Sequence, residues 1–316
     1  MIVTPTANPS VDRTVTLAEP LRRGGVQRAL GATVQAGGKG VNVSRVVAMA
    51  GTATVAVLPG SEGDPVSRDL AAAGIDHRVV PGGGPIRTNV AITEIDGTTT
   101  KINEPGAPLD EERRRALTEL LVELSATASW IVLSGSLPPG VPADWYVELV
   151  RRLRGPRIAV DTSDAPLVTL ARRFDVAAPA LIKPNSEELA QLTGADPERL
   201  HDPVEAVRAA ARLVDRGVGA VLATLGAAGA VLVTGDGAWH ATAPDVTPCS
   251  TVGAGDSALA GYLLADLDGA APADRLRRAV AYGTAAVTLP GTGLPGPDHV
   301  QVDAVTVTAL DSLPHP

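Results

Sequence analysis

The chain has 316 residues, and its composition excludes several classes of protein. Its formal net charge of −8 argues against nucleic acid as a primary partner, because a phosphate backbone is bound by a broad basic surface. A single cysteine, Cys249, cannot form an internal disulfide and is typical of a reducing compartment. We find no signal-peptide pattern and no apolar run near the roughly 20 residues that span a bilayer, so we expect no membrane partner and a cytoplasmic location.

Short apolar runs alternate with helical segments along most of the chain. The expected strands span residues 2–6, 53–58, 130–133, 157–161, 180–183 and 220–225. The expected helices span residues 41–50, 65–73, 111–124, 144–153, 186–192, 204–215, 256–265 and 275–287. This alternation predicts an α/β fold with a mostly parallel sheet flanked by helices, in which ligands bind beyond the carboxyl ends of the strands.

Two early stretches depart from this alternation. Residues 11–34 contain β-prone residues and no convincing helix, and residues 87–103 alternate apolar and polar positions around an Asp96-Gly97 turn. They could form a small sheet that covers the active site, although an ordinary edge hairpin is the alternative. We therefore predict two units: an α/β core of residues 1–10, 35–84 and 106–316, and a small β lid of residues 11–34 and 85–105.

The motif with the clearest chemistry is Gly253-Ala254-Gly255-Asp256, which leads into an apolar helix. Glycines just before a helix let successive backbone N–H groups converge on an anion, and the helix dipole favours negative charge there. Asp256 lies in the first turn, where its carboxylate could take a proton from an attacking hydroxyl group. The alternative is an acid that only stabilises the helix, by about 0.3–1 kcal/mol. The two glycines beside Asp256 favour catalysis.

A second glycine-rich segment is Gly37-Gly38-Lys39-Gly40, followed closely by Asn42. The glycines permit close backbone approach to a ligand, and the two polar side chains add one ammonium and one amide. The spacing matches neither the Walker A loop nor the dinucleotide-binding fingerprint. Alone, this turn is only a weak indication of ligand binding.

Lysine is rare in this chain, since only Lys39, Lys101 and Lys183 stand among 27 basic side chains. Two of the three lie in motifs marked by glycine or proline, which favours a requirement for a compact ammonium group there. The alternative is that codon bias favours arginine over lysine throughout the chain, and that these three lysines remain by chance.

Further polar side chains lie near expected strand ends. Asn185 and Glu188 follow Lys183, and they suit a hydrated Mg²⁺ as well as the two halves of a helix capping box. Asp12 follows the first strand and could accept hydrogen bonds from sugar hydroxyls, or be a solvated acid after a turn. Arg87 offers a guanidinium suited to a phosphate group, although a surface arginine on a hairpin is the common alternative.

Taken together, these segments resemble those of the ribokinase-like (PfkB) carbohydrate kinases, from Thr6 to about Gly293 and in the same order. The Gly-Ala-Gly-Asp motif is highly specific for this family. Within the family, the segments around Lys39 and Lys183 resemble those of the branch that acts on sugar phosphates. The chain departs from the family pattern at Thr224, where relatives often have serine, and in the loop of residues 289–293, which lacks a common asparagine.

The resemblance implies a role for each matching residue. Asp256 would be the base that activates the sugar hydroxyl, with the backbone of Gly253, Ala254 and Gly255 as the anion hole. The residues implied in substrate binding are Asp12, Gly37, Gly38, Lys39, Asn42, Arg87 and Ser136, of which Lys39 and Arg87 would face the phosphate already on the sugar. The residues implied in nucleotide binding are Lys183, Asn185, Glu188, Thr224, Gly226 and Thr251, with Asn185 and Glu188 holding Mg²⁺ through water.

The resemblance also implies transfer of the γ-phosphoryl group of ATP to a phosphosugar, with fructose 1-phosphate preferred over tagatose 6-phosphate and fructose 6-phosphate. It implies Mg²⁺, a monovalent cation as in some relatives, and a homodimer that packs lid on lid. A non-catalytic sensor of sugar phosphates on the same fold is the alternative of another class, but such a sensor should have lost Asp256 or its glycines. A dehydrogenase, a zinc enzyme and a serine hydrolase are disfavoured because their motifs are missing.

Overall fold

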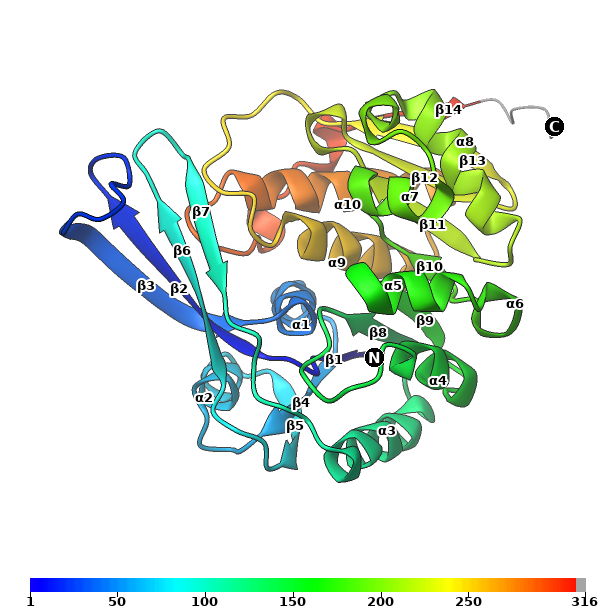
Figure 1. Cartoon of the computed structure of the whole chain (residues 1–316). Helices are drawn as coiled ribbons and strands as arrows, with labels where there is room; N and C mark the ends of the chain where they lie inside the picture. The colour runs from blue at the N-terminus through cyan, green and yellow to red at the C-terminus, as the bar shows by residue number, and fades with distance from the viewer. Residues whose placement is uncertain (311–316) are drawn as a thin grey trace.

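The computed structural model describes residues 1–310 and arranges them around two separate β-sheets (Figure 1). The larger sheet has ten strands, in this order from edge to edge: β14 (Thr306–Leu310), β13 (Gly237–Thr242), β12 (Ala230–Thr234), β11 (Ala220–Thr224), β10 (Leu181–Ile182), β9 (Arg157–Asp161), β8 (Trp130–Ser134), β1 (Ile2–Pro5), β4 (Thr54–Gly60) and β5 (Asp76–Pro81). Residues 311–316 of the predicted core segment lie outside the described residues.

The larger sheet is parallel from β5 to β11, and β12, β13 and β14 extend it in antiparallel fashion. Strands β1 and β8 are buried along their whole length, because helices cover both faces of the sheet. The prediction of a mostly parallel sheet flanked by helices is confirmed. Parallel strands end at a common edge, and the loops at that edge position the site described below.

Two layers of helices enclose the larger sheet. One face carries α1 (Lys39–Met49), α9 (Ala254–Leu267) and α10 (Pro272–Val287), which share an apolar core with alternate residues of the strands. The other face carries α3 (Glu111–Ser125), α4 (Trp145–Arg152), α5 (Asp164–Ala171), α6 (Phe174–Ala177), α7 (Ser186–Thr193) and α8 (Pro203–Val214). Helix α2 (Pro65–Ala72) packs beside β4 through Val66 and Leu70. The described chain also contains the short 3₁₀ helices η1 (Pro197–His201), η2 (Gly226–Ala228), η3 (Pro297–His299) and η4 (Val302–Ala304).

The smaller sheet projects from the core on the left of Figure 1. Its order is β3 (Ala29–Gly37), β2 (Ser10–Leu17), β6 (Arg87–Thr93) and β7 (Thr99–Asn103). The two stretches that broke the α/β alternation therefore lie in one sheet, and β6 and β7 form an antiparallel hairpin. Strand β3 runs to Gly37, three residues past the predicted end of that segment, and leads directly into α1.

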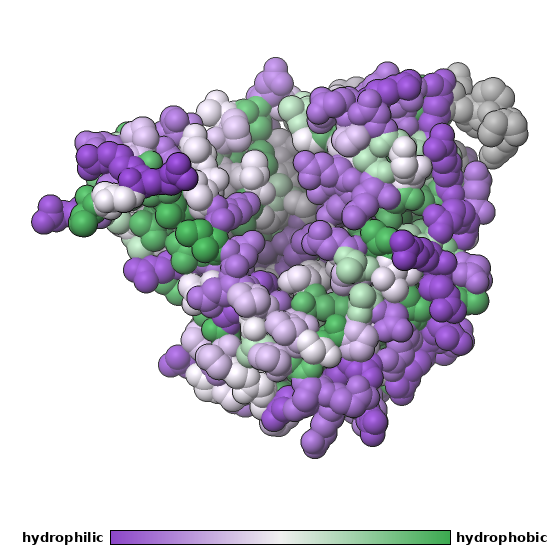
Figure 2. Space-filling view, in the orientation of Figure 1, coloured by the Kyte–Doolittle hydropathy of each residue, from purple (hydrophilic) through white to green (hydrophobic). Residues whose placement is uncertain are grey.

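Rows of facing residues run across the smaller sheet, and successive rows point to opposite faces. One row holds Gln35, Asp12, Asn89 and Asn103, which are all polar. The next row toward the tip holds Val34, Arg13, Val90 and Ile102. The sheet thus has one polar face and one largely apolar face, and Figure 2 shows apolar side chains gathered on this lobe.

The structure also contains elements that the apolar pattern did not predict. These are β5, the antiparallel strands β12, β13 and β14, and helices α5 and α6. The predicted strand of residues 180–183 shortens to β10, while α9 begins at Ala254, two residues before its predicted start. No helix among residues 1–310 has both the length and the apolar character that crossing a membrane requires.

Candidate active site

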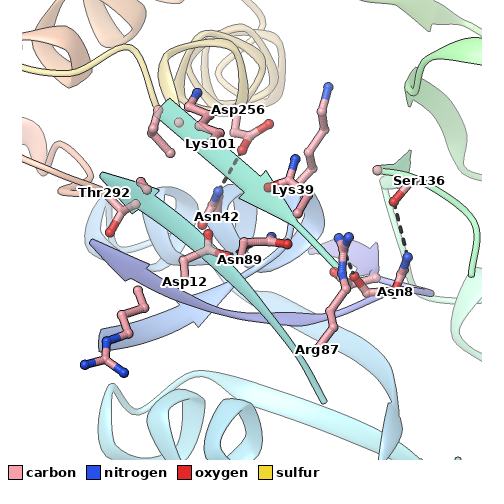
Figure 3. A pocket seen from close by; sticks show the side chains of 18 of the residues that line it. Asn8, Asp12, Lys39, Asn42, Arg87, Asn89, Lys101, Ser136, Asp256 and Thr292 are labelled. Atoms are coloured by element: carbon pink, nitrogen blue, oxygen red, sulfur yellow. Dashed lines mark hydrogen bonds between the residues drawn. The ribbon is translucent and has the colours of Figure 1, made fainter. Parts of the chain in front are cut away.

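A cavity of about 290 Å³ lies between the polar face of the smaller sheet and the larger sheet (Figure 3). Separate parts of the chain contribute to its wall, among them the smaller sheet, the segment after β1, the start of α1, the loop after β8, the start of α9 and the loop that holds Thr292. The predicted site residues that line it are Asp12, Gly38, Lys39, Asn42, Arg87, Ser136, Gly253 and Asp256. Most of the predicted substrate-binding residues therefore meet in one place.

The N-terminus of α9 forms one end of this cavity. Gly253 is the N-cap, with φ of 77°, and an added Cβ would lie 2.8 Å from a Leu294 methyl group, so glycine is required for both conformation and space. The N–H of Ser257 donates to Gly253 O at 2.8 Å, which closes the first helical turn. The N–H groups of residues 254–256 are left without an intrahelical acceptor, and the helix dipole makes this end attractive to an anion.

The same helix terminus also borders a second cavity of about 500 Å³. Gly253 and Asp256 line the first cavity, whereas Ala254 and Gly255 line the second. The predicted nucleotide-site residues that line the second cavity are Thr224, Gly226 and Thr251. The free N–H groups of α9 thus stand where the two cavities approach each other, which is where a group passing between two bound molecules must lie.

Asp256 is the acid at this junction, and it is only 6 % exposed. Its Oδ2 accepts a hydrogen bond of 2.8 Å from Asn42 Nδ2 (Figure 3). Burial raises the pKa of Asp256 above its ordinary value, and the neighbouring Asp161 adds to this, while Lys39 and Asn42 act in the opposite direction. A carboxylate with a raised pKa is a better proton acceptor than an ordinary aspartate.

Two lysines meet one buried carboxylate below the cavity floor. The carboxylate belongs to Asp161, the last residue of β9. Its Oδ1 lies at a distance of 2.7 Å from Nζ of Lys39, and its Oδ2 lies at a distance of 3.3 Å from Nζ of Lys183. Burial alone would raise the pKa of Asp161, but the two ammonium groups lower it overall. Burial would likewise lower the pKa of Lys39, but Asp161 and Asp256 raise it overall. Asp161 and Lys39 are therefore both charged at neutral pH.

Sequence reasoning did not assign Asp161, and the available signal was modest. An acid as the last residue of a buried parallel strand points to the ligand-binding edge of the sheet. Its link to Lys39 depends on the order of the strands, which the local sequence does not reveal. Gly255 is explained by the same cluster, since an added Cβ would lie 3.1 Å from Lys183 Nζ.

Asp12 stands on the polar face of the smaller sheet and is held in place by two donors. Ser10 Oγ donates to Asp12 Oδ1 at 2.7 Å, and Asn89 Nδ2 donates to the same oxygen at 3.0 Å. An added Cβ on Gly37 would collide with this carboxylate, so Gly37 supports Asp12 from behind. The other carboxylate oxygen is free to accept a hydrogen bond from a ligand hydroxyl.

Arg87 occupies the opposite end of the cavity from α9. Its two terminal nitrogens donate to the backbone oxygens of Glu104 at 2.9 Å and of Asn8 at 3.1 Å. Burial lowers the pKa of Arg87, and nearby Asp12 opposes that shift. Asn8 Nδ2 in turn donates to Ser136 Oγ at 3.3 Å, which links this end to the loop after β8. The guanidinium is thus oriented by the backbone rather than by an acid, and its charge remains available to an anion.

Asn185 and Glu188 do not line either cavity, but lie in a third one beside Ser163. They form a complete capping box on α7, since Asn185 Oδ1 accepts from Glu188 N at 2.8 Å and Glu188 Oε2 accepts from Asn185 N at 2.9 Å. Ser163 also lines the first cavity, so the two spaces adjoin. Among residues 1–310, no group of three or more His, Cys, Asp or Glu side chains gathers as a metal site. Mg²⁺ commonly takes only one or two carboxylates besides water and phosphate, so the second oxygen of Glu188 suits it.

The geometry defines a class of protein: a phosphotransferase in which an acid and a helix terminus stand between two ligand cavities. The chain belongs to the pfkB family of carbohydrate kinases, whose model matches residues 6–299. It is an ATP-dependent sugar-phosphate kinase.

Similar proteins support this assignment along nearly the whole chain. A 1-phosphofructokinase of Rhodobacter capsulatus is 38 % identical over 321 residues, covering 99 % of this chain and 98 % of that protein. A 1-phosphofructokinase of Haloferax volcanii is 38 % identical over 299 residues, covering 93 % of each. The crystal structure of phosphofructokinase-2 from Escherichia coli in complex with potassium is 30 % identical with a TM-score of 0.85, covering 94 % of this chain and 96 % of that chain.

Proposed function

We propose that the protein transfers the γ-phosphoryl group of ATP to fructose 1-phosphate and so forms fructose 1,6-bisphosphate. The observation that carries this proposal is the shared helix terminus, where Asp256 faces one cavity and the Gly255 backbone faces the other. The similarity to 1-phosphofructokinases over 99 % of the chain supports the choice of acceptor. Tagatose 6-phosphate and fructose 6-phosphate remain the rival acceptors.

In the proposed step, the acceptor hydroxyl lies beside Asp256 and the nucleotide lies in the larger cavity. Asp256 takes the hydroxyl proton as the oxygen attacks the γ-phosphorus, and the bond from that phosphorus to the bridging oxygen breaks to release ADP. The N–H groups at the start of α9 stabilise the negative charge on the transferred group. Lys39 and Lys183, held in place by Asp161, add positive charge beneath it. Lys39 is therefore proposed to serve the transferred group, and not the phosphate already on the sugar as the resemblance implies.

The phosphate already on the sugar is proposed to bind at the other end of the cavity. In fructose 1-phosphate the phosphate and the accepting hydroxyl are at opposite ends of the molecule. Arg87 lies at the end remote from α9, so it is placed to receive that phosphate while Asp256 receives the hydroxyl. Asp12, Asn42 and Ser136 stand between these ends and suit the remaining hydroxyl groups.

The nucleotide is proposed to occupy the cavity of about 500 Å³ that Thr224, Gly226 and Thr251 help to line. The divalent metal that the kinase family implies would be Mg²⁺, held through water by Asn185 and Glu188, and it would neutralise phosphate charge. A monovalent cation near residues 289–293 is part of the proposal as well, supported by the potassium complex of the Escherichia coli relative.

The smaller sheet is proposed to act as a lid and as a dimer surface. Its polar face covers the acceptor cavity, where closure would exclude water and so limit hydrolysis of ATP. Its opposite face carries Val34, 63 % exposed, and Ile102, 57 % exposed, in one row. A second copy of the chain would bury this apolar face, so we propose a homodimer that packs lid on lid.

The proposal is tested by measuring ATP consumption with fructose 1-phosphate, fructose 6-phosphate, tagatose 6-phosphate, fructose and ribose. Fructose 1-phosphate should give the highest kcat/KM. Asp256→Asn should lower kcat by about 10²- to 10⁴-fold while ATP still binds, because the variant retains the shape but not the base. Asp268→Asn, an exposed acid at the other end of α9, is the matched control and should retain full turnover. Near-normal turnover by Asp256→Asn would remove the assigned base.

A further inference from the structure

Lys101 lies on β7, the edge strand of the smaller sheet, and lines the acceptor cavity (Figure 3). In the sheet it stands opposite Ala91, which in turn stands opposite Thr14. Because alternate residues of a strand point to opposite faces, this row shares the face of the row that holds Asp12 and Asn89. The side chain of Lys101 therefore belongs to the cavity face and not to the apolar face of the sheet.

The row that holds Lys101 lies at the α9 end of the cavity. Thr14, in that row, lies against Gly291, where an added Cβ would be 3.6 Å from Thr14 Oγ1. Leu294 follows shortly after Gly291 and packs against Gly253, the N-cap of α9. Figure 3 likewise shows Lys101 and Asp256 toward the same end of the cavity.

Arg87 lies at the far end of the same face. It is four residues from Ala91 along β6, which corresponds to roughly 13 Å at the rise of an extended strand. On this face of the smaller sheet, Arg87 and Lys101 thus stand at opposite ends of the cavity, while Arg13 belongs to the row that faces the other side. A molecule with one phosphate at each end would meet Arg87 at one and Lys101 at the other.

Lys101 differs from the other two lysines of the chain in having no fixed partner. Lys39 and Lys183 both pair with Asp161, whereas Lys101 makes no hydrogen bond or ion pair with residues 1–310 in the structure. Its side chain is exposed at the cavity mouth. An unpaired, flexible ammonium with three donors is suited to follow an anion that forms during a reaction.

We propose that Lys101 binds the phosphoryl group as it is transferred, and then the new phosphate of the product, from the side of the smaller sheet. This inference rests on the proposed function, and it adds a cation to the transfer end of the site. Because Lys101 is carried by the proposed lid, its charge reaches the phosphoryl group only while the cavity is covered. Coverage of the substrate and neutralisation of charge would then occur together.

The test compares binding of fructose 1,6-bisphosphate with binding of fructose 1-phosphate by isothermal titration calorimetry. Lys101→Met should weaken bisphosphate binding by about ten- to hundredfold, the value of one hydrogen bond to a charged group, and leave fructose 1-phosphate binding within about twofold. Lys101→Arg should retain most of the bisphosphate affinity, because it keeps the charge. Arg151→Met, which removes an exposed charge on α4, is the control for net charge and should change neither affinity.

Kinetics give the second measurement on the same variants. Lys101→Met should lower kcat and leave the KM for fructose 1-phosphate nearly unchanged, since the contact arises only in the transfer step. Equal loss of affinity for both sugars would place Lys101 at the existing phosphate and overturn the inference, as would unaltered bisphosphate binding in an active protein. A wild-type protein that neither phosphorylates fructose 1-phosphate nor binds the bisphosphate would overturn the proposed function itself.

Discussion

The buried cluster of Lys39, Asp161 and Lys183 makes a quantitative prediction about stability. Asp161→Asn keeps the size of the side chain but removes the one carboxylate that contacts both ammonium groups. Asp161 is 2 % exposed and Lys183 is 5 % exposed, so water cannot replace the lost charge. The variant therefore leaves positive charge in the interior without its partner.

Breaking a buried ion pair by removing one member costs roughly 3–5 kcal/mol. With an unfolding entropy of about 2.1 cal/mol/K per residue, this cost lowers the Tm of a 316-residue chain by roughly 5–8 °C. Removing Lys39 as well should restore part of the lost free energy of unfolding. Lys183 is then the one ammonium group of the cluster, and the negative charge of Asp256 balances it. The Asp161→Asn and Lys39→Met double-mutant cycle should therefore show favourable coupling.

The pH dependence of this effect has a defined sign. The pKa of Asp161 is lowered in the folded protein, because the two lysines outweigh the effect of burial. Its stabilising contribution is thus present above the ordinary value of 3.8 and is lost as the pH falls through the lower, folded value. The gap in Tm between the wild type and Asp161→Asn should stay constant from neutral pH down to that range and then close.

Thermal unfolding followed by circular dichroism at several pH values measures all of these quantities. Asp164→Asn is a suitable control, because Asp164 is exposed, lies three residues further along the chain and has φ of 55°, a conformation that asparagine also tolerates. A Tm for Asp161→Asn that matches those of the wild type and of Asp164→Asn at neutral pH would refute the reasoning. A gap that persists unchanged far below 3.8 would show that the charge of Asp161 is not its cause.

Three further predictions concern the acceptor site and the dimer. Arg87→Ala should raise the KM for fructose 1-phosphate by about ten- to hundredfold, the value of a hydrogen bond to a charged group, with a smaller effect on kcat; an unchanged KM would place the phosphate elsewhere. Asn42→Ala should move the acidic limb of the kcat/KM profile to higher pH, since the lost hydrogen bond favours ionised Asp256; a limb at the same or lower pH would contradict this. Val34→Asp should give a monomer by size-exclusion chromatography with light scattering, whereas the same change at the exposed Val176 of α6 should not; an unaltered Val34→Asp dimer, or a wild-type monomer, would rule out the apolar face as the interface.

The local sequence determined the α/β alternation and the candidate residues at the start of α9. Helices and strands of the core were predictable because each repeats apolar residues at its own period. Gly253 and Asp256 were recognisable for a similar reason. A glycine before a helix and an acid in the first turn of that helix lie within four consecutive residues, so the pattern is visible in the local sequence. The capping box of Asn185 and Glu188 was recognisable as the alternative to Mg²⁺ binding, because both halves lie within one turn.

Only the tertiary structure decided which distant groups meet. Lys39 and Asp161 are 122 residues apart, and Asn42 and Asp256 are 214 apart, so their contacts depend on strand order and not on local pattern. The position of Lys101 at the α9 end of the cavity follows from the register of β6 and β7 with β2, which the alternation of single strands does not specify. The antiparallel strands β12, β13 and β14 were not predicted for the same physical reason. A short apolar run does not reveal which other strands it will pair with in the sheet.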